Sequence, residues 1–176
     1  MTRKLFALLL TGLTCAGGLS ACQSSDATDD SAAAAPQVAA APQTAEDDMV
    51  VAYEVVDGVT IPQALTDQPG DPINGRAVAI HRQKGNCLAC HVMPIPEESF
   101  HGEIGPDLNG VASRYDAGEL RLRVVDPKVI NPDTIMPAFY KVNGFHRVLA
   151  DFEGKPMLTA QEVEDVVAYL QTLTEE

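Results

Sequence analysis

The sequence predicts an all-α domain in which a few helices and long loops wrap around one central group. Helical spacing of apolar residues recurs in separate stretches, and the loops between them are long and rich in Pro and Gly. Aromatic residues make up 5% of the chain and none is Trp, so the core has few large side chains of its own. A small domain built this way gains from an apolar object at its centre.

The final helix is the most clearly marked. Thr159 and Glu162 form a capping box, in which each side chain satisfies a backbone N–H at the helix start. Apolar residues then recur at the spacing of one helical face: Val163, Val166, Val167 and Leu170. We expect this face to pack against the core.

Two earlier helices are predicted from their boundaries. Asp71 and Pro72 open the first, with Pro in a first-turn position, and we expect it to continue to about Lys84, with Gly85 as the stop. The second covers residues 116–125 and is ended by Pro127. The acidic residues of the chain's helices, including those of the final helix, are interpreted as solvated helix faces.

Residues 49–70 are predicted to form an extended lead-in segment. They contain a β-branched run that is closed by a turn at Asp57 and Gly58. Strands and helices do not alternate in the sequence and no repeat is present, so the pattern does not favour an α/β or a solenoid fold.

The first 21 residues are typical of a secretory signal peptide. Arg3 and Lys4 precede an apolar stretch that is too short to cross a bilayer comfortably. That stretch ends in Leu-Ser-Ala-Cys22, which resembles the bacterial lipoprotein cleavage box, so Cys22 is a candidate lipidation site. The alternative is an ordinary signal peptide that leaves Cys22 free. We favour the lipid anchor because a stray thiol is a liability in an oxidising compartment.

Residues 22–48 are predicted to be a disordered acidic tether, rich in Ala and Pro. This stretch holds six acids, no bases and hardly any large apolar side chain, so it cannot bury enough surface to offset the cost of ordering. The formal net charge of the chain is −13, which argues against binding nucleic acid or anionic lipid by charge. A basic partner surface would suit this charge, and so would a requirement for solubility alone.

Cys87, Cys90 and His91 form the Cys-x-x-Cys-His motif of c-type haem attachment. The spacing lets both thiols bond to the two vinyl-derived carbons of one porphyrin, with the adjacent His under the iron. A thioredoxin-like redox pair or half of a zinc site also uses Cys-x-x-Cys. The first has no use for the His, and the second needs more ligands than this exported chain offers. We therefore predict one covalent haem c, with His91 as the near-side iron ligand.

The far side of the iron has six candidate ligands: Met93, Met136, Met157, His81, His101 and His146. Met93 is too close to His91 in sequence to reach the other face of the ring. Met136 lies in a downstream loop bracketed by proline, which would hold a thioether rigidly, and we assign it as the second iron ligand. Met157, beside Pro156, is the next candidate, and a role for Met136 as a core filler is the other alternative. For the three histidines, surface or loop roles are favoured.

Pro106 is predicted to support His91. A ligating His needs an acceptor for its second ring nitrogen, and a Gly-Pro turn aims a backbone carbonyl rigidly. We therefore assign the Pro106 carbonyl to the His91 ring, the alternative being that Gly105 and Pro106 form only a turn. With His and Met as axial ligands the iron has no open position for O₂ or substrate, so the site predicts an electron carrier with no catalytic residue of its own.

These motifs, taken in order, resemble class I cytochrome c: Cys87 to His91, Gly105-Pro106, Met136-Pro137 and a final amphipathic helix. Finer strings resemble the SoxX family, the small c-type cytochrome subunits of the SoxAX complex of bacterial sulfur oxidation. They are IGPDL (104–108), GVASRY (110–115), INPDTIMPAFY (130–140) and LTAQEVEDVVAYL (158–170). The resemblance implies the class I cytochrome c fold. It covers roughly residues 71–173, inside a cytochrome c domain expected to span residues 71–176.

The resemblance also implies partners and a place in electron transfer. SoxAX, an L-cysteine S-thiosulfotransferase, joins thiosulfate to a cysteine of the SoxYZ carrier in the periplasm, and the chemistry belongs to the SoxA subunit. The resemblance therefore implies a SoxA-like haem subunit as heterodimer partner, a SoxYZ-like carrier, and a downstream cytochrome as electron acceptor. This chain would be the non-catalytic, electron-accepting subunit. The lipoprotein-like cleavage box and the tether depart from the soluble pattern of that family.

Two other functions are compatible with the residues. A freestanding periplasmic class I cytochrome c would carry electrons to an oxidase or from a dehydrogenase. A peroxidase or gas sensor would require a sixth iron position that is open or displaceable. A larger cytochrome that co-purifies with the chain would favour the SoxAX-type reading over both.

Overall fold

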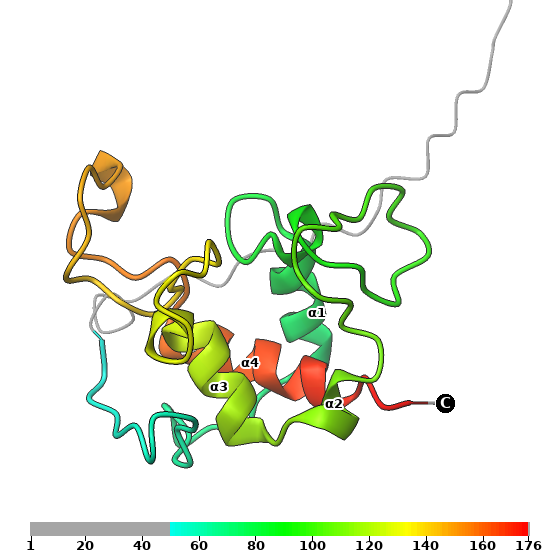
Figure 1. The fold of residues 1–176 in the computed structure, drawn as a ribbon, viewed down its shortest axis with the longest axis horizontal. Coiled ribbons are helices and arrows are strands. Elements are labelled where there is room, and N and C mark those ends of the chain that lie inside the picture. Colours follow the sequence, from blue (N-terminus) through cyan, green and yellow to red (C-terminus); the bar gives the residue numbers. More distant parts are fainter. Residues whose placement is uncertain (1–49, 176) are drawn as a thin grey trace, which may run out of the picture. The chain divides into compact units, whose positions relative to one another are not determined.

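The computed structural model describes residues 50–175, and the predicted signal peptide, Cys22 and tether lie outside them. Within these residues the structure has four α-helices, three short 3-10 helices and no β-strand (Figure 1). The elements are α1 (Pro72–Ile80), η1 (Cys87–Ala89), α2 (Val111–Arg114), α3 (Ala117–Val125), η2 (Pro127–Val129), η3 (Ala150–Phe152) and α4 (Ala160–Gln171). The all-α prediction is confirmed.

The last helix, α4, packs against both α1 and α3. Its crossing with α1 is unusually close, because a Cβ atom on Gly75 would lie 1.8 Å from the carbonyl oxygen of Asp165. Any residue other than glycine at position 75 would force the two helices apart. On α4 the predicted apolar face is buried in the core, as expected: Val163, Val166, Val167 and Leu170.

The helix boundaries follow from their caps. The Asp71 carboxylate accepts a hydrogen bond from the Ile73 N–H at 2.9 Å, and Pro72 occupies the first turn of α1 as predicted. The helix ends at Ile80, earlier than expected, because His81 leaves the helical conformation and donates its N–H to the Val78 carbonyl. The capping box of α4 is confirmed, and α3 has a second one between Asp116 and Glu119.

The interpretation of the acids as solvated helix faces is wrong for α4. Glu162, Glu164 and Asp165 are all buried, with at most 8% of each residue exposed. Glu162 pairs with Lys84, and Glu164 forms a two-pronged ion pair with Arg121 on α3. Asp165 accepts hydrogen bonds from neutral donors, which are the Asp71 N–H and the side chains of Asn74 and Gln161. The reason is that α4 is covered on its polar side as well as its apolar side.

The lead-in segment has the predicted turn but little regular structure. Asp57 and Gly58 adopt the left-handed conformation, and a single antiparallel bridge joins Val56 to Thr60 across them. Beyond the turn, Ile61 and Leu65 are buried in the core. The segment is therefore part of the fold of the domain.

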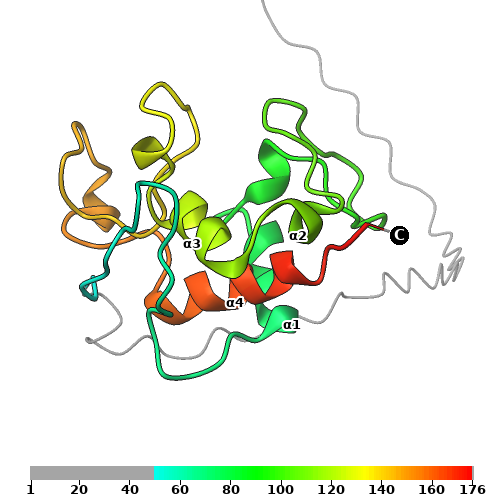
Figure 2. The same ribbon diagram turned by 60° about the horizontal axis from the view of Figure 1, so that its bottom comes forward.

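Long loops occupy one side of the helices. Figure 2 shows the green segment that contains residues 87–106 and the yellow loop that contains Met136 rising on the same side of α3 and α4. The predicted stretches 93–106 and 144–156 hold no α-helix, and residues 127–137 hold only the 3-10 turn η2. No helix among residues 50–175 has the length and apolar character needed to cross a membrane.

Candidate functional site

The short 3-10 turn η1 presents the two cysteines. Asn86 enters it in the left-handed conformation, and the N–H groups of Cys90 and His91 both donate to the Cys87 carbonyl, at 3.1 and 2.9 Å. This turn places Cys87, Cys90 and His91 within a single tight bend. Cys87 and Cys90 are not joined by a disulfide. Before any group is attached, burial raises the pKa of the Cys87 thiol to about 11.

The His91 ring is hydrogen-bonded to the residue that the sequence assigned to it. Its Nδ1 atom lies 2.7 Å from the Pro106 carbonyl oxygen. A carbonyl can only accept, so Nδ1 carries the proton of this hydrogen bond. The other ring nitrogen, Nε2, is left as the atom that can bind a metal, and the hydrogen bond holds the ring in one orientation.

Two glycines let the 92–106 loop close over this bend. A Cβ atom on Gly105 would lie 2.4 Å from Cε1 of the His91 ring. A Cβ atom on Gly102 would lie 2.1 Å from the Ala89 carbonyl oxygen. Both glycines also donate their N–H groups to η1, to the Leu88 and Cys90 carbonyls at 2.7 Å. The backbone at Gly105 therefore lies against the His91 ring, and the backbone at Gly102 lies against Ala89, each too close for a side chain.

His101 braces the same loop from inside. Its Nδ1 atom accepts the Met93 N–H at 3.2 Å, and its Nε2 atom lies 3.2 Å from the Ile95 carbonyl oxygen. Met93 and Ile95 are buried, with 2% and 0% exposure. Both ring nitrogens of His101 and the side chain of Met93 are thus used in packing the loop, in line with the loop role favoured for His101.

Arg114 on α2 braces the turn that follows Pro106. Its guanidinium donates to the carbonyls of Asp107 and Asn109, at 2.7 and 2.8 Å. The Leu108 N–H donates to Val92 at 2.9 Å, which closes the turn onto the residue after His91. These contacts fix the backbone that aims the Pro106 carbonyl.

Met136 lies in the loop between α3 and Tyr140. It is half-buried and packs against the hydrophobic core. Its N–H donates to the Thr134 hydroxyl at 3.2 Å, and the Lys128 ammonium donates to the Thr134 carbonyl at 2.5 Å. The loop next to Met136 is therefore held by a lysine and a threonine of the loop itself.

The other candidate ligands lie in different settings. Met157 is also half-buried against the core, just before Leu158, whose N–H donates to the Phe139 carbonyl at 3.0 Å. His81 is exposed at the end of α1, where its Nδ1 accepts the Gln83 N–H. His146 is exposed in the loop before η3. Cys22 lies outside the described residues.

The residues present fit a covalently attached haem. Two thiols and an imidazole with Nε2 available come together on one turn, which is the donor set that such a group needs. Large uncovered apolar side chains adjoin Pro106 and Met136: Ile104 is 68% exposed and Ile135 is 77% exposed. A porphyrin ring requires apolar surface of this kind.

The comparisons with known proteins decide the family. The family model for cytochrome c matches residues 74–174, which include η1, His91 and Met136. The chain belongs to the cytochrome c family. Among solved structures, this cytochrome is similar to a chain in the crystal structure of SoxXA from P. pantotrophus. The two are 40% identical with a TM-score of 0.65, over 70% of this chain and 95% of that chain. The search of curated proteins found no match.

These findings establish the cofactor and the general role of the cytochrome. It carries one haem c, bound covalently at the Cys87 and Cys90 pair, and it serves electron transport. It is a monohaem cytochrome c related to the SoxXA complex subunit. The thioredoxin-like and zinc alternatives for the cysteine pair are therefore set aside.

Sequence reasoning missed several residues of the site. Gly105 was noted only as part of a turn, and its contact with the His91 ring was not foreseen. Gly102 and Arg114 were not singled out, although two glycines three residues apart before a proline are a signal of close backbone approach. His101 was left with an unspecified loop role because its two partners lie in a bend that only the fold reveals.

Proposed function

We propose that this cytochrome is the electron-transfer subunit of a SoxAX-type complex, in which a SoxA-like haem subunit conjugates thiosulfate to a cysteine of a SoxYZ-like carrier. The similarity to a SoxXA chain, 40% identical over 95% of that chain, supports this proposal. Forming one S–S bond between thiosulfate and a thiol releases two electrons and the thiol proton. Those electrons must leave the partner subunit one at a time, and this chain is suited to receive them.

His91 and Met136 are the proposed iron ligands. Haem c, when bound, accepts and donates single electrons. The Pro106 carbonyl holds the His91 ring at 2.7 Å and leaves Nε2 to the iron. A thioether on the other side raises the reduction potential, which favours acceptance of electrons. If His91 and Met136 both held the iron, no position would be left on it for substrate, and thiosulfate chemistry would belong to the partner.

The proposed setting is the periplasm, with a downstream cytochrome as electron acceptor. The signal-like first 21 residues and a haem attached through cysteine thioethers support export. Cys22 is proposed to carry a lipid, which would anchor the domain through the tether of residues 22–48. Mass spectrometry of the mature protein tests the anchor, because an unmodified Cys22 or a cut elsewhere would contradict it.

The ligand assignment is tested by Met136→Ala, with Met157→Ala as the matched control, since both methionines are half-buried against the core. We expect Met136→Ala to lower the reduction potential and remove the absorption band typical of Met–iron bonding, with haem still attached. Met157→Ala should keep both. An unchanged potential and spectrum in Met136→Ala would overturn the assignment and reopen the peroxidase or sensor alternative.

The partner assignment is tested by purification of the tagged chain from its own host. A larger haem-bearing subunit that co-purifies in equal amount, with thiosulfate-dependent reduction of both haems in the presence of a carrier cysteine, supports the proposal. A monodisperse monomer that accepts electrons from a generic donor and not from such a subunit would favour the freestanding cytochrome.

A further inference from the structure

The loop that carries Met136 is closed at its base by contacts between its two ends. The Lys141 ammonium, just after the loop, lies 2.6 Å from the carboxylate of Asp126, just before it. Asp126 is only 5% exposed, so its carboxylate is shielded from water, whereas the Lys141 side chain is 35% exposed. Two backbone hydrogen bonds complete the closure, from Phe139 to Val124 at 3.1 Å and from Tyr140 to Val125 at 3.3 Å. We call this the loop base.

The lead-in segment reaches the loop base with its first residues. The Val51 N–H donates to the Tyr140 hydroxyl at 2.7 Å, across 89 positions of sequence. Tyr140 has 0% exposure, so this hydrogen bond ties the lead-in to a buried side chain of the loop base. A backbone N–H joined to a buried hydroxyl fixes the position of both segments.

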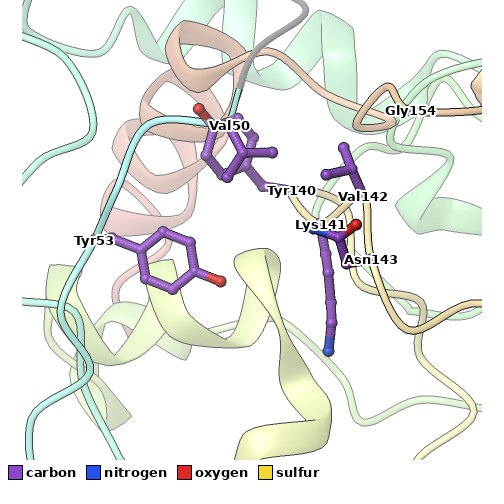
Figure 3. A pocket seen from close by; sticks show the side chains of 7 residues that line it. All are labelled: Val50, Tyr53, Tyr140, Lys141, Val142, Asn143 and Gly154. Atoms are coloured by element: carbon purple, nitrogen blue, oxygen red, sulfur yellow. The ribbon is translucent and has the colours of Figure 1, made fainter.

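Tyr53 of the lead-in faces the ion pair of the loop base. Figure 3 shows its ring directed across a cavity toward Lys141, with Val50 and Tyr140 above it. Burial raises the pKa of the Tyr53 hydroxyl, the Asp126 carboxylate raises it further, and the Lys141 ammonium lowers it. The hydroxyl therefore lies within the field of both members of the pair. Tyr53 and Lys141 both line this cavity, which has a volume of about 510 Å³.

The far end of the lead-in is anchored independently of the loop base. The Ile61 N–H donates to the Gly118 carbonyl of α3 at 3.1 Å, and the Ile61 carbonyl accepts from Arg121 at 2.6 Å. The Leu65 N–H donates to the Glu164 carboxylate at 2.9 Å. Because Arg121 and Glu164 are themselves a buried ion pair, this anchor is rigid. The lead-in therefore spans from a fixed point on α3 and α4 to the loop base.

We propose that the lead-in segment acts as a strap that positions Met136, with Val51 and Tyr53 holding the loop base in place. The proposal rests on the proposed function, in which Met136 is an iron ligand. The strap works through the loop base, so Tyr53, Tyr140 and Lys141 are positioning residues and do not touch the reacting atoms. A loop base that shifts moves the backbone between Asp126 and Lys141, and Met136 lies in that stretch.

The experiment measures the reduction potential and the Met–iron absorption band of the holoprotein, well below its melting temperature. The variants are Tyr53→Ala, Tyr140→Phe and Lys141→Met, with Lys141→Arg as the conservative rescue. The matched control is Thr66→Ala, because Thr66 ties the same segment to Gln161 on α4 and not to the loop base. Met136→Ala gives the shift in potential and the loss of the band that are expected when the proposed ligand is removed completely.

We expect the three strap variants to lower the potential in the same direction as Met136→Ala but by a smaller shift, and to weaken the band partly. Lys141→Arg and Thr66→Ala should match the wild type in both. Wild-type potential and band in all three strap variants, with Met136→Ala strongly shifted, would overturn the strap and leave the ligand assignment intact. An unshifted Met136→Ala would overturn the ligand assignment instead. Equal shifts in Thr66→Ala would show general loosening and would also overturn the strap.

Discussion

The loops that carry the two proposed iron ligands, His91 on the near side and Met136 on the far side, are held by different kinds of contact. On the near side, the His91 ring sits under backbone that is too close for a side chain, since a Cβ atom on Gly105 would lie 2.4 Å from it. On the far side, Met136 depends on polar contacts, from Lys128 to Thr134 within the loop and between Asp126 and Lys141 at its base.

This difference teaches how each ligand type is controlled. An imidazole binds a metal through one nitrogen in a fixed plane, so a steric enclosure and one hydrogen bond to Pro106 suit it. A thioether side chain has several rotatable bonds and adapts, so the position of its loop decides how well it binds. A side chain added at Gly105 would displace the His91 ring outright. The ion pair and hydrogen bonds of the Met136 loop can instead be weakened one at a time by substitution. With Met136 as the proposed second ligand, we expect its loop to be where the reduction potential is tuned.

The largest expected effect comes from removing the haem, which the His91 loop and the Met136 loop are both proposed to bind. Cys87→Ser combined with Cys90→Ser should yield a chain without covalent haem that fails to fold, because the loops lose their organiser. Mass spectrometry checks the haem, and a thermal melt followed by circular dichroism checks folding. A cooperative melt of the haem-free double variant would contradict this expectation.

The next effect tests the steric control of the near side. Gly105→Ala places a methyl group against the His91 ring, and we expect a loss of about 3 kcal/mol of unfolding free energy with a changed haem spectrum. The matched control is Gly58→Ala, where a Cβ atom meets nothing within 4 Å but the backbone has a φ of +71°. That control should cost roughly 1 kcal/mol from backbone strain alone and leave the spectrum unchanged. Equal haem spectra in the two variants would contradict the steric control of the His91 ring by Gly105.

A smaller effect tests the polar control of the far side. Lys128→Met removes the exposed ammonium that holds the Thr134 carbonyl, and we expect a loss of at most about 1 kcal/mol in stability. The Met–iron absorption band should nevertheless weaken, because Met136 follows Thr134 by two residues. Denaturant titration and absorption spectra measure the two quantities. A band of wild-type strength would show that the loop base alone positions Met136.

The smallest effect concerns an exposed contact of the near-side loop. A backbone hydrogen bond is the main cause that lowers the pKa of the Glu97 carboxyl, and the neighbouring Arg76 lowers it further. A lowered pKa gives stability that is present above the ordinary pKa of Glu and is lost as the pH falls through the lower, folded value. The difference in unfolding free energy between wild type and Glu97→Gln should therefore decrease as the pH falls from the ordinary pKa of Glu to the lower pKa of the folded state. A difference that grows on acidification would contradict the sign of the shift.

Local chemistry explains what could be predicted. The caps at Asp71 and Thr159 are set by residues within three positions, so the starts of α1 and α4 were predictable. The end of α1 was placed too late, because the break at His81 has no residue such as Gly or Pro to mark it. Attachment at Cys87 and Cys90 follows from the spacing of the motif alone.

Long-range contacts explain what could not be predicted. The buried acids of α4 look solvated in the sequence, because their partners Arg121 and Lys84 lie 43 and 78 positions away. Whether a glycine near His91 is replaceable depends on a distance that no sequence pattern contains.

The sequence by itself determined the helices that carry the fold, the covalent attachment of haem c and the pairing of His91 with the Pro106 carbonyl, since each depends on neighbours or on a short motif. Only the tertiary structure decided that the lead-in belongs to the domain, that Tyr53 and Val51 meet the loop base, and that Gly105 lies against the His91 ring. Those features join segments that approach one another only after the chain has folded. Long-range packing, and not a local sequence motif, brings them together.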